Sequence, residues 1–338
     1  MSKKKIVLDI LKYALFFGAG LGIFIWVYSG QNPDKIWAGL KDFNYWWIAA
    51  SLGISMFSHL FRAMRWKMLI ESIGYKPRLS NTFLSILVMY LANYALPRLG
   101  EVTRCGILKK YEQIPFTEQL GTVLMERVVD VIVLIVMLIV VFLADWDTLV
   151  GFLMPGSGNI EYKDISFLGS WWFLGLIGLF LLICVAVWLF RKRLARIRGI
   201  KKLTSFAGKF VEGLKSVLHL KNPWLFILLT LGIYGSYYLM TWFVMLGFRP
   251  TQGLSPFIAL AVLAMGSVGM VLPVQAGMGT YHFFVTQTLM LYAIVESEGA
   301  VLALVLHGST TIFVIIIGVI ALVLLPLINR ERIPAGEQ

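Results

Sequence analysis

Long apolar stretches constrain the fold of this chain more than any other feature. A helix needs about 20 consecutive apolar residues to cross the hydrocarbon core of a bilayer. Of the 338 residues, 59% are hydrophobic and only 14% are charged, which excludes an ordinary soluble globular protein. We therefore expect an all-α polytopic membrane protein with about six transmembrane helices. The predicted spans cover about residues 9–29, 44–62, 118–143, 168–190, 223–248 and 300–326.

Two further regions, about residues 80–112 and 255–296, each hold a pair of shorter apolar pieces around an interruption. In the first region, Pro97 removes a backbone donor and Gly100 weakens the helix, so a break is expected between the two pieces. Irregular backbone at membrane depth is tolerated only where protein or a water-filled cavity surrounds it. Each region is therefore predicted to form a re-entrant helix pair.

The distribution of Lys and Arg predicts how the chain threads through the membrane. The N-terminal lysines and the segment after the second span, which carries Arg62 and Arg65, are expected in the cytoplasm. Residues 144–167 are mainly acidic and are expected outside. The basic stretch 191–222 is expected inside, together with the C-terminus. The first re-entrant pair then enters from the cytoplasm and the second from outside.

This threading predicts inverted repeats within one membrane domain, residues 1–326, followed by a short cytoplasmic tail, 327–338. The first repeat covers about 9–143 and the second about 168–326. A local echo supports the repeat, because Leu-Pro precedes a glycine in both interruptions. Broken helices of inverted repeats meet near the midplane, where transporters hold their substrate. We expect the two interruptions to enclose a wet, arginine-lined chamber.

Charged side chains follow the first interruption directly. Arg98 and Arg104 flank Glu101, and a guanidinium group suits the phosphate of a lipid headgroup. The alternative is that one of these arginines pairs with Glu101 and only fixes the break. Asn93 is expected to satisfy backbone carbonyls that Pro97 frees.

A second charged cluster lies near the start of the third span. Glu126 and Asp130 are four residues apart and share a helix face, whereas Arg127 points elsewhere. Ionisable groups this far into an apolar run are not expected to face lipid. They form either an internal ion network with Glu101 and the arginines or the surroundings of a headgroup site, and one does not exclude the other.

The second interruption contains Pro273, Gly277, Gly279 and His282. The glycines allow close approach of either a helix or a substrate. His282 either couples movement to protons or serves as a neutral hydrogen-bond partner. We expect these four residues to shape the wall opposite the arginines.

The remaining motifs restrict the function further. Within the basic stretch, apolar residues at helical spacing between 203 and 218 predict an amphipathic helix on the inner leaflet. Topology accounts for the net charge of +12, so no nucleic-acid partner is expected. We find no catalytic signature and expect no cofactor, metal site or enzymatic activity.

These motifs resemble the transmembrane region of lysylphosphatidylglycerol synthases, a flippase-like or YbhN-like membrane family. The resemblance rests on Arg62-x-x-Arg65-Trp66, Asn93-x-x-Leu96-Pro97-x-x-Gly100-Glu101-x-x-Arg104, Glu126-Arg127-x-x-Asp130 and the turn around Pro273, Gly277 and Gly279. The late motif of the family usually looks like Pro-Gly-Gly-x-Gly-x-x-Glu. This chain departs from it, with Gln275 and Ala276 in place of Pro-Gly and His282 in place of Glu.

The resemblance implies lipid translocation or binding without aminoacylation, because the sequence leaves no room for the transferase of full-length synthases. The prediction is a bacterial inner-membrane flippase for an anionic phospholipid or a polyprenyl-phosphate-linked lipid. Arg98 and Arg104 would hold the phosphate. Two alternatives remain: an intramembrane enzyme with Glu101 or Glu126 as base, and a non-transporting regulatory subunit that binds a partner of envelope synthesis.

Overall fold

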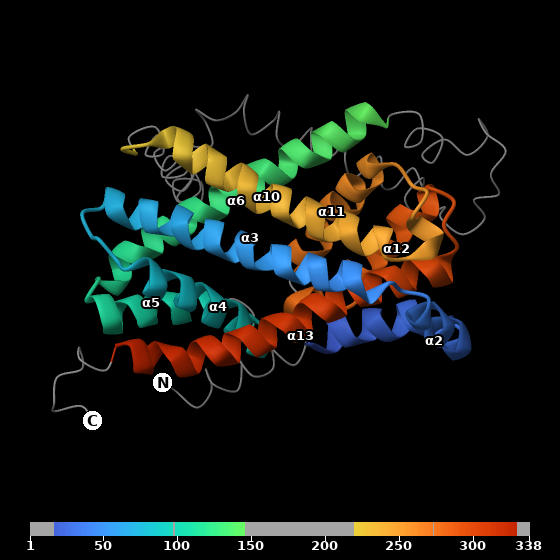
Figure 1. The fold of residues 1–338 in the computed structure, drawn as a ribbon, viewed down its shortest axis with the longest axis horizontal. Helices are drawn as coiled ribbons and strands as arrows, with labels where there is room; N and C mark the ends of the chain where they lie inside the picture. The colour runs from blue at the N-terminus through green and yellow to red at the C-terminus, as the bar shows by residue number, and fades with distance from the viewer. Residues whose placement is uncertain (1–16, 97–98, 146–219, 273, 330–338) are drawn as a thin grey trace, which may run out of the picture. The chain divides into compact units, whose positions relative to one another are not determined.

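The computed structural model describes residues 17–96, 99–145, 220–272 and 274–329 (Figure 1). The chain divides into two compact units, Met1–Leu138 with His219–Gln338, and Ile139–Leu218. Only residues 139–145 of the second unit are described, and they form the end of one helix. The contacts reported below all lie within the first unit.

The described residues are almost entirely helical, as predicted. The one β-type pairing among them is an isolated bridge between Phe43 and Phe248. The helices are Phe17–Ser29, α2 (Pro33–Lys41), α3 (Tyr45–Ser72), α4 (Leu79–Ala95), α5 (Leu99–Glu112), α6 (Phe116–Ala144), α10 (Pro223–Leu246), α11 (Pro256–Val271), α12 (Thr280–Leu291) and α13 (Glu296–Ile328), with short 3-10 turns at Arg249–Thr251 (η1) and Gln275–Gly277 (η2).

Three of the helices, α6, α10 and α13, are long and apolar enough to cross a membrane. They coincide with three of the predicted spans. Large apolar side chains on the outer face of α13, such as Ile312, Ile316 and Ile320, are exposed, as lipid-facing residues would be. The predicted span 168–190 and the amphipathic helix in the basic stretch lie outside the described residues. The full number of spans and the inverted repeats stay predictions.

Helix α3 extends beyond the predicted end of the second span. That span was expected to finish at residue 62, and the helix continues to Ser72. Arg62 and Arg65 are buried within the protein, with 4% and 0% of their surface exposed, and their cytoplasmic side stays a prediction. At 1.5 Å per residue, α3 is about 42 Å long. The helix continues past the arginines because carboxylates of a neighbouring helix pair with them.

Both predicted interruptions separate pairs of short helices. Helices α4 and α5 pack against each other and are separated by extended backbone at Leu96. Helices α11 and α12 also pack together around η2, where Ala276, Gly277 and Gly279 have positive φ angles of 50°, 69° and 78°. The pairs are thus confirmed as helices, whereas their entry into the membrane from opposite sides stays a prediction.

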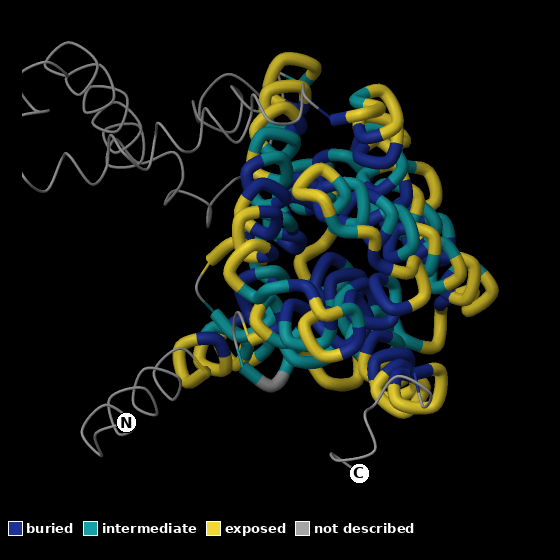
Figure 2. The backbone as a smooth tube through the Cα atoms, turned by 90° about the vertical axis from the view of Figure 1, so that its left-hand side faces the viewer, coloured by how far each residue is buried: buried dark blue, intermediate teal, exposed yellow. Residues whose placement is uncertain are grey.

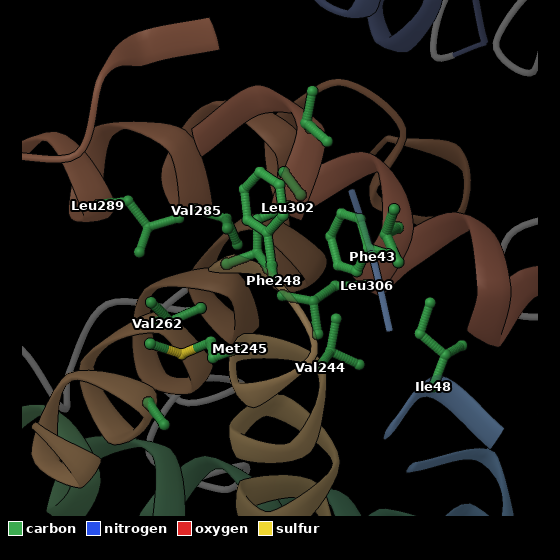
Figure 3. Packing of buried hydrophobic residues seen from close by; sticks show 14 of the residues in the cluster. Phe43, Ile48, Val244, Met245, Phe248, Val262, Val285, Leu289, Leu302 and Leu306 are labelled. Atoms are coloured by element: carbon green, nitrogen blue, oxygen red, sulfur yellow. The ribbon is translucent and has the colours of Figure 1, made fainter. Parts of the chain in front are cut away.

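Helix packing in the first unit brings together segments far apart in the sequence. In Figure 1, α3 and α10 run side by side, and α13 packs against both α4 and α12. Figure 2 shows the buried stretches of backbone on the inner sides of the helices and the exposed stretches on the outer sides. A large apolar cluster joins α3, α10, α11, α12 and α13, and in it the rings of Phe43 and Phe248 stack at 4.4 Å (Figure 3).

Candidate functional site

Seven charged side chains from three helices form one cluster, here called the ion cluster. Helix α3 brings arginines that lie one turn apart, α5 brings a carboxylate and an arginine, and α6 brings two carboxylates and an arginine. The members are Arg62, Arg65, Glu101, Arg104, Glu126, Arg127 and Asp130.

Glu126 is the centre of the ion cluster and is completely buried. Its Oε1 accepts hydrogen bonds from Arg62 at 2.8 Å and from Arg65 at 3.3 Å. Asp130, one turn later on α6, accepts from the same two arginines at 3.0 and 2.7 Å. The prediction that Glu126 and Asp130 share a helix face is therefore correct. The two α3 arginines span both carboxylates and join α3 to α6.

Arg104 is also completely buried, and its ion-pair partner lies on α6. Its Nη2 lies 2.7 Å from Oε2 of Glu126, an ion pair whose N–H directions do not meet hydrogen-bond geometry. Its guanidinium lies over the ring of Trp66, 4.3 Å from the ring centre. A cation over an indole is attracted by the ring quadrupole. The alternative in which Arg104 pairs with Glu101 is not found among the described residues, where the ion-pair partner of Arg104 is Glu126.

Glu101 pairs instead with Arg127, at 2.6 Å. This pair forms the open side of the ion cluster, since 43% of the Arg127 side chain and 20% of the Glu101 side chain are exposed. Arg127 also lies 3.6 Å from Asp130. The predicted internal ion network is therefore present among the described residues.

The charges of the ion cluster do not balance. Four arginines face three carboxylates, which leaves one excess positive charge. An uncompensated charge away from water is costly, so an anion that approached the ion cluster would be stabilised. Arg98, the first arginine after the interruption, lies outside the described residues together with Pro97 and Pro273.

A cavity of about 230 Å³ lies beside the ion cluster, and residues of six helices give it a mostly apolar surface with polar groups at intervals. The lining residues are Ser51, Ser55, Ser58 and His59 of α3, Tyr90 and Tyr94 of α4, Tyr237, Met240 and Thr241 of α10, Leu263, Ser267 and Met270 of α11, Tyr281 of α12, and Leu306, His307, Thr310 and Val314 of α13. No Asp, Glu, Lys or Arg belongs to this lining in the part of the chain that is described. The described arginines of the ion cluster adjoin the cavity without lining it, and Arg98 lies outside the described residues, so the arginine-lined chamber stays a prediction.

Tyr237 connects the cavity to the ion cluster. Its hydroxyl lies 3.2 Å from Nη2 of Arg62, which donates to it, and 3.3 Å from the hydroxyl of Tyr90. His59, one turn before Arg62, lies against Tyr90 with 4.9 Å between ring centres. Only 5% of His59 is exposed, and neither of its ring nitrogens has a hydrogen-bond partner. One face of α3 thus carries polar groups from Ser51 through His59 to the arginines.

The two interruptions meet at this cavity. The side-chain amide of Gln275 in η2 donates to the carbonyl of Tyr94, at the end of α4, at 2.6 Å. The ring of His307 on α13 lies 3.0 Å from the carbonyl of Ala276. The predicted proximity of the two breaks is therefore correct for the described residues around them.

The predicted residues of the first interruption have structural contacts. The side-chain oxygen of Asn93 accepts from the backbone N–H of Gly100 at 2.8 Å. Asn93 therefore satisfies a donor at the start of α5, a contact that was not predicted, and its bond to a carbonyl that Pro97 frees stays a prediction. A Cβ at Gly100 would lie 2.2 Å from the carbonyl oxygen of Met89, so this glycine allows α4 and α5 to approach closely.

The glycines of the second interruption also serve packing. Gly277 and Gly279 have positive φ, and a Cβ at Gly279 would lie 2.5 Å from the backbone nitrogen of Phe24 in the first described helix. His282 is buried 4.9 Å from the His307 ring and 5.1 Å from the Phe24 ring. It does not line the cavity, where its neighbour Tyr281 lies instead. Its role in proton coupling stays a prediction.

Several residues of the site were missed as site residues from the sequence: His59, Arg62, Arg65 and Tyr237. Arg62 and Arg65 were assigned to cytoplasmic charge, although their spacing from Ser51, Ser55 and Ser58 continues one helix face. That spacing is the signal that identifies them. Among the described residues, no three His, Cys, Asp or Glu side chains gather as a metal ion would require.

Comparisons with known proteins agree with the resemblance seen in the motifs. The family model described as "Lysylphosphatidylglycerol synthase TM region" matches residues 10–318. The UPF0104 membrane protein MJ1595 of Methanocaldococcus jannaschii is 26% identical over 180 residues, which are 52% of this chain. The match covers 49% of that relative, so the chain spans about half of its length. No solved structure matches the chain.

Proposed function

The chain belongs to the lysylphosphatidylglycerol synthase transmembrane-region family and is a multi-pass membrane protein, and we propose that it moves an anionic lipid between leaflets. The lipid is a phospholipid or a polyprenyl-phosphate-linked lipid. The membrane is the bacterial inner membrane, with both termini of the protein in the cytoplasm. The proposal rests on one observation. The ion cluster carries an excess positive charge, and Tyr237 connects this cluster to a cavity that polar groups help to line.

The excess charge supports recognition of a phosphate. Arginine carries a planar fork of donors that suits phosphate oxygens, and ionisable groups inside a membrane protein mark substrate paths by default. Arg127 is the member of the ion cluster with the most exposed side chain, so it can exchange its carboxylate partner for a ligand. Arg98 would add a further positive charge near the same interruption.

The cavity supports movement of a headgroup past the apolar part of the protein. A headgroup that crosses a bilayer needs polar contacts, because burying an unpaired polar group costs several kcal/mol in hydrocarbon. The polar face of α3 supplies such contacts from Ser51 to Arg62. The acyl chains can remain in the lipid outside.

A transporter accounts for the ion cluster better than an intramembrane enzyme does. A catalytic base must be free to accept a proton. Glu126 is surrounded by three arginines, and Glu101 is paired with Arg127. A regulatory subunit of envelope synthesis remains the third alternative, and it would bind a partner protein and move no lipid by itself.

The test measures lipid movement in proteoliposomes with acyl-labelled fluorescent phosphatidylglycerol and, separately, a labelled polyprenyl phosphate. A membrane-impermeant reductant quenches the outer leaflet, so the protected fraction reports movement. Wild-type protein is expected to move one of these probes, and failure with both would contradict the proposal. Lys67→Ala provides a control, because Lys67 pairs with Glu71 on the same helix and lies outside the ion cluster.

A matched pair of variants tests the charge itself. Arg127→Gln removes the excess charge among the described residues and is expected to slow movement at least about tenfold, since a charge-assisted contact contributes about 1.5–3 kcal/mol. Adding Glu101→Gln restores the excess charge but not the Arg127 contact, and it is expected to restore part of the rate. Equal rates in the two variants would show that the charge balance has no part in transport.

A further inference from the structure

The Ser and Thr hydroxyls that line the cavity all direct their hydrogens away from it. Each donates to a backbone carbonyl, at distances between 2.6 and 3.1 Å. The pairs are Ser51 to Met240, Ser55 to Leu52, Ser58 to Ser55, Thr241 to Tyr237, Ser267 to Leu263 and Thr310 to Leu306.

A hydroxyl has one hydrogen to donate and two lone pairs that accept. Because the hydrogens of these six groups are used, they present only acceptors to the cavity. The histidines and tyrosines of the lining can also donate, so the wall suits a ligand whose groups both donate and accept, as hydroxyls do. Leu263, Met270, Leu306 and Val314 supply apolar surface beside these acceptors.

His59 is an independent observation that points to a ligand at this wall. The residue lines the cavity, is 95% buried, and has no hydrogen-bond partner for either ring nitrogen among the described residues. Buried polar side-chain atoms in proteins nearly always have a hydrogen-bond partner, so such an atom calls for one. In its neutral form the ring donates with one nitrogen and accepts with the other, as a hydroxyl ligand can.

The charges around the cavity select among donor-rich ligands. Among the described residues its lining carries no carboxylate, and the nearest charged group is Arg62, which reaches Tyr237 of the wall. An ammonium headgroup would thus meet an excess positive charge with no counter-ion. A ligand whose donors are neutral hydroxyls avoids this repulsion, and a phosphate attached to it is attracted towards Arg62.

We infer that this cavity binds the hydroxyl-bearing, uncharged end of a phospholipid or lipid-phosphate headgroup, a polyol or sugar, with the phosphate directed towards the ion cluster. This inference rests on the proposed lipid transport and names the headgroup class that the transport site accepts. The cavity exceeds by far the roughly 10–15 Å³ that one water molecule requires, so it has room for more than a single water.

The experiment measures lipid retention by native mass spectrometry of the full chain, released from nanodiscs made of phosphatidylcholine. Three short-chain probes are compared: phosphatidylglycerol, which carries phosphate and hydroxyls, phosphatidic acid, which carries phosphate alone, and phosphatidylethanolamine, which carries an ammonium group. We expect phosphatidylglycerol to be retained at least about fivefold better than the other two, since one hydrogen bond contributes about two- to tenfold. Equal retention of phosphatidylglycerol and phosphatidic acid would mean that the cavity holds water only and would overturn the inference.

Variants locate the preference within the cavity. Thr241→Val and Ser267→Ala each remove an acceptor and are expected to lower the preference for phosphatidylglycerol about two- to tenfold. His59→Phe retains the ring against Tyr90 and removes both unpartnered nitrogens. This variant is expected to lower the preference for phosphatidylglycerol by an equal or larger factor. The control is Thr288→Val, because Thr288 is buried, donates to the Phe284 carbonyl at 2.7 Å and does not line the cavity. A preference unchanged in the cavity variants would overturn the inference.

The two proposals fail in different ways. If phosphatidylglycerol is retained selectively and no lipid moves in proteoliposomes, the cavity is a polyol site and the transport proposal is wrong. If lipids move with no dependence on headgroup hydroxyls, transport stands and the inference about the cavity is wrong.

Discussion

The ion cluster and the cavity lie on the same face of α3, one turn apart. Their buried polar groups find partners in different ways. In the ion cluster, carboxylates and arginines pair at 2.6 to 3.6 Å and leave one excess positive charge. In the cavity, hydroxyls donate their hydrogens to the backbone of their own or a neighbouring helix, and their lone pairs remain free to accept. Charged groups cannot be left that way, because an unpaired buried charge is far more costly than an unpaired lone pair.

The difference predicts that substitutions in the ion cluster affect stability, whereas substitutions in the cavity affect ligand selection. The largest effect on stability is expected from Glu126→Gln. This change leaves Arg62, Arg65 and Arg104 with one fewer negative charge in a buried place, and loss of a buried partner costs about 3–5 kcal/mol. Size-exclusion chromatography and thermal melting in detergent measure the folded fraction. Glu71→Gln, in an exposed α3 pair, is the control, and equal melting of the two variants would contradict a structural role of Glu126.

The connection between the two regions is tested by Tyr237→Phe, which keeps the ring and removes the hydroxyl that Arg62 contacts. We expect a loss of about 0.6–1.7 kcal/mol in the free energy of unfolding, because polar contacts between membrane helices average about 0.6 kcal/mol and rarely exceed about 1.7 kcal/mol. The neighbouring Tyr238→Phe serves as control, since its hydroxyl donates to the Pro256 carbonyl at an exposed site. If Tyr238→Phe lowered the free energy of unfolding more than Tyr237→Phe did, the contact between Arg62 and Tyr237 would not couple the ion cluster to the cavity.

The open side of the ion cluster is expected to contribute less. A double-mutant cycle with Glu101→Gln and Arg127→Gln isolates the interaction between these partly exposed side chains. The expected coupling energy is about 0.5–1 kcal/mol in thermal or denaturant unfolding. A coupling energy of several kcal/mol would mean that Glu101 and Arg127 stabilise the fold as strongly as the buried pairs of the ion cluster do.

The smallest effect on stability is expected from Ser267→Ala in the cavity. The carbonyl of Leu263 that accepts from this serine belongs to a helix and retains its backbone hydrogen bond. The expected change in the free energy of unfolding is about 0.5 kcal/mol or less, measured by the same melting experiment. A loss comparable to that of Glu126→Gln would show that the cavity hydroxyls hold the helices together.

Much of the architecture follows from sequence patterns that act locally. Apolar length predicts α6, α10 and α13, and proline with glycine predicts the interruptions after α4 and α11. The association of Glu101, Glu126 and Arg127 follows from the cost of exposing such groups to lipid. These features are predictable because each depends on one segment and its solvent.

Other features depend on partners that only the folded chain brings together. Counting positive charges places Arg62 and Arg65 outside the membrane, whereas α6 supplies the carboxylates that allow them to be buried in α3. The cavity combines small polar residues of four helices with tyrosines of two others, and in each helix they are a minority within an apolar run. No single stretch of the sequence contains enough of them to predict the cavity.

The hydrogen bond from Gln275 to the Tyr94 carbonyl has a mechanical consequence. It ties the kink of one helical hairpin to the kink of the other, so rocking one hairpin alone would have to break it. A proline, which the family motif has at this position, has no side-chain amide to form such a tether. In this chain the two helical hairpins must therefore move together during a conformational cycle, or the hydrogen bond between Gln275 and Tyr94 must break at one defined step.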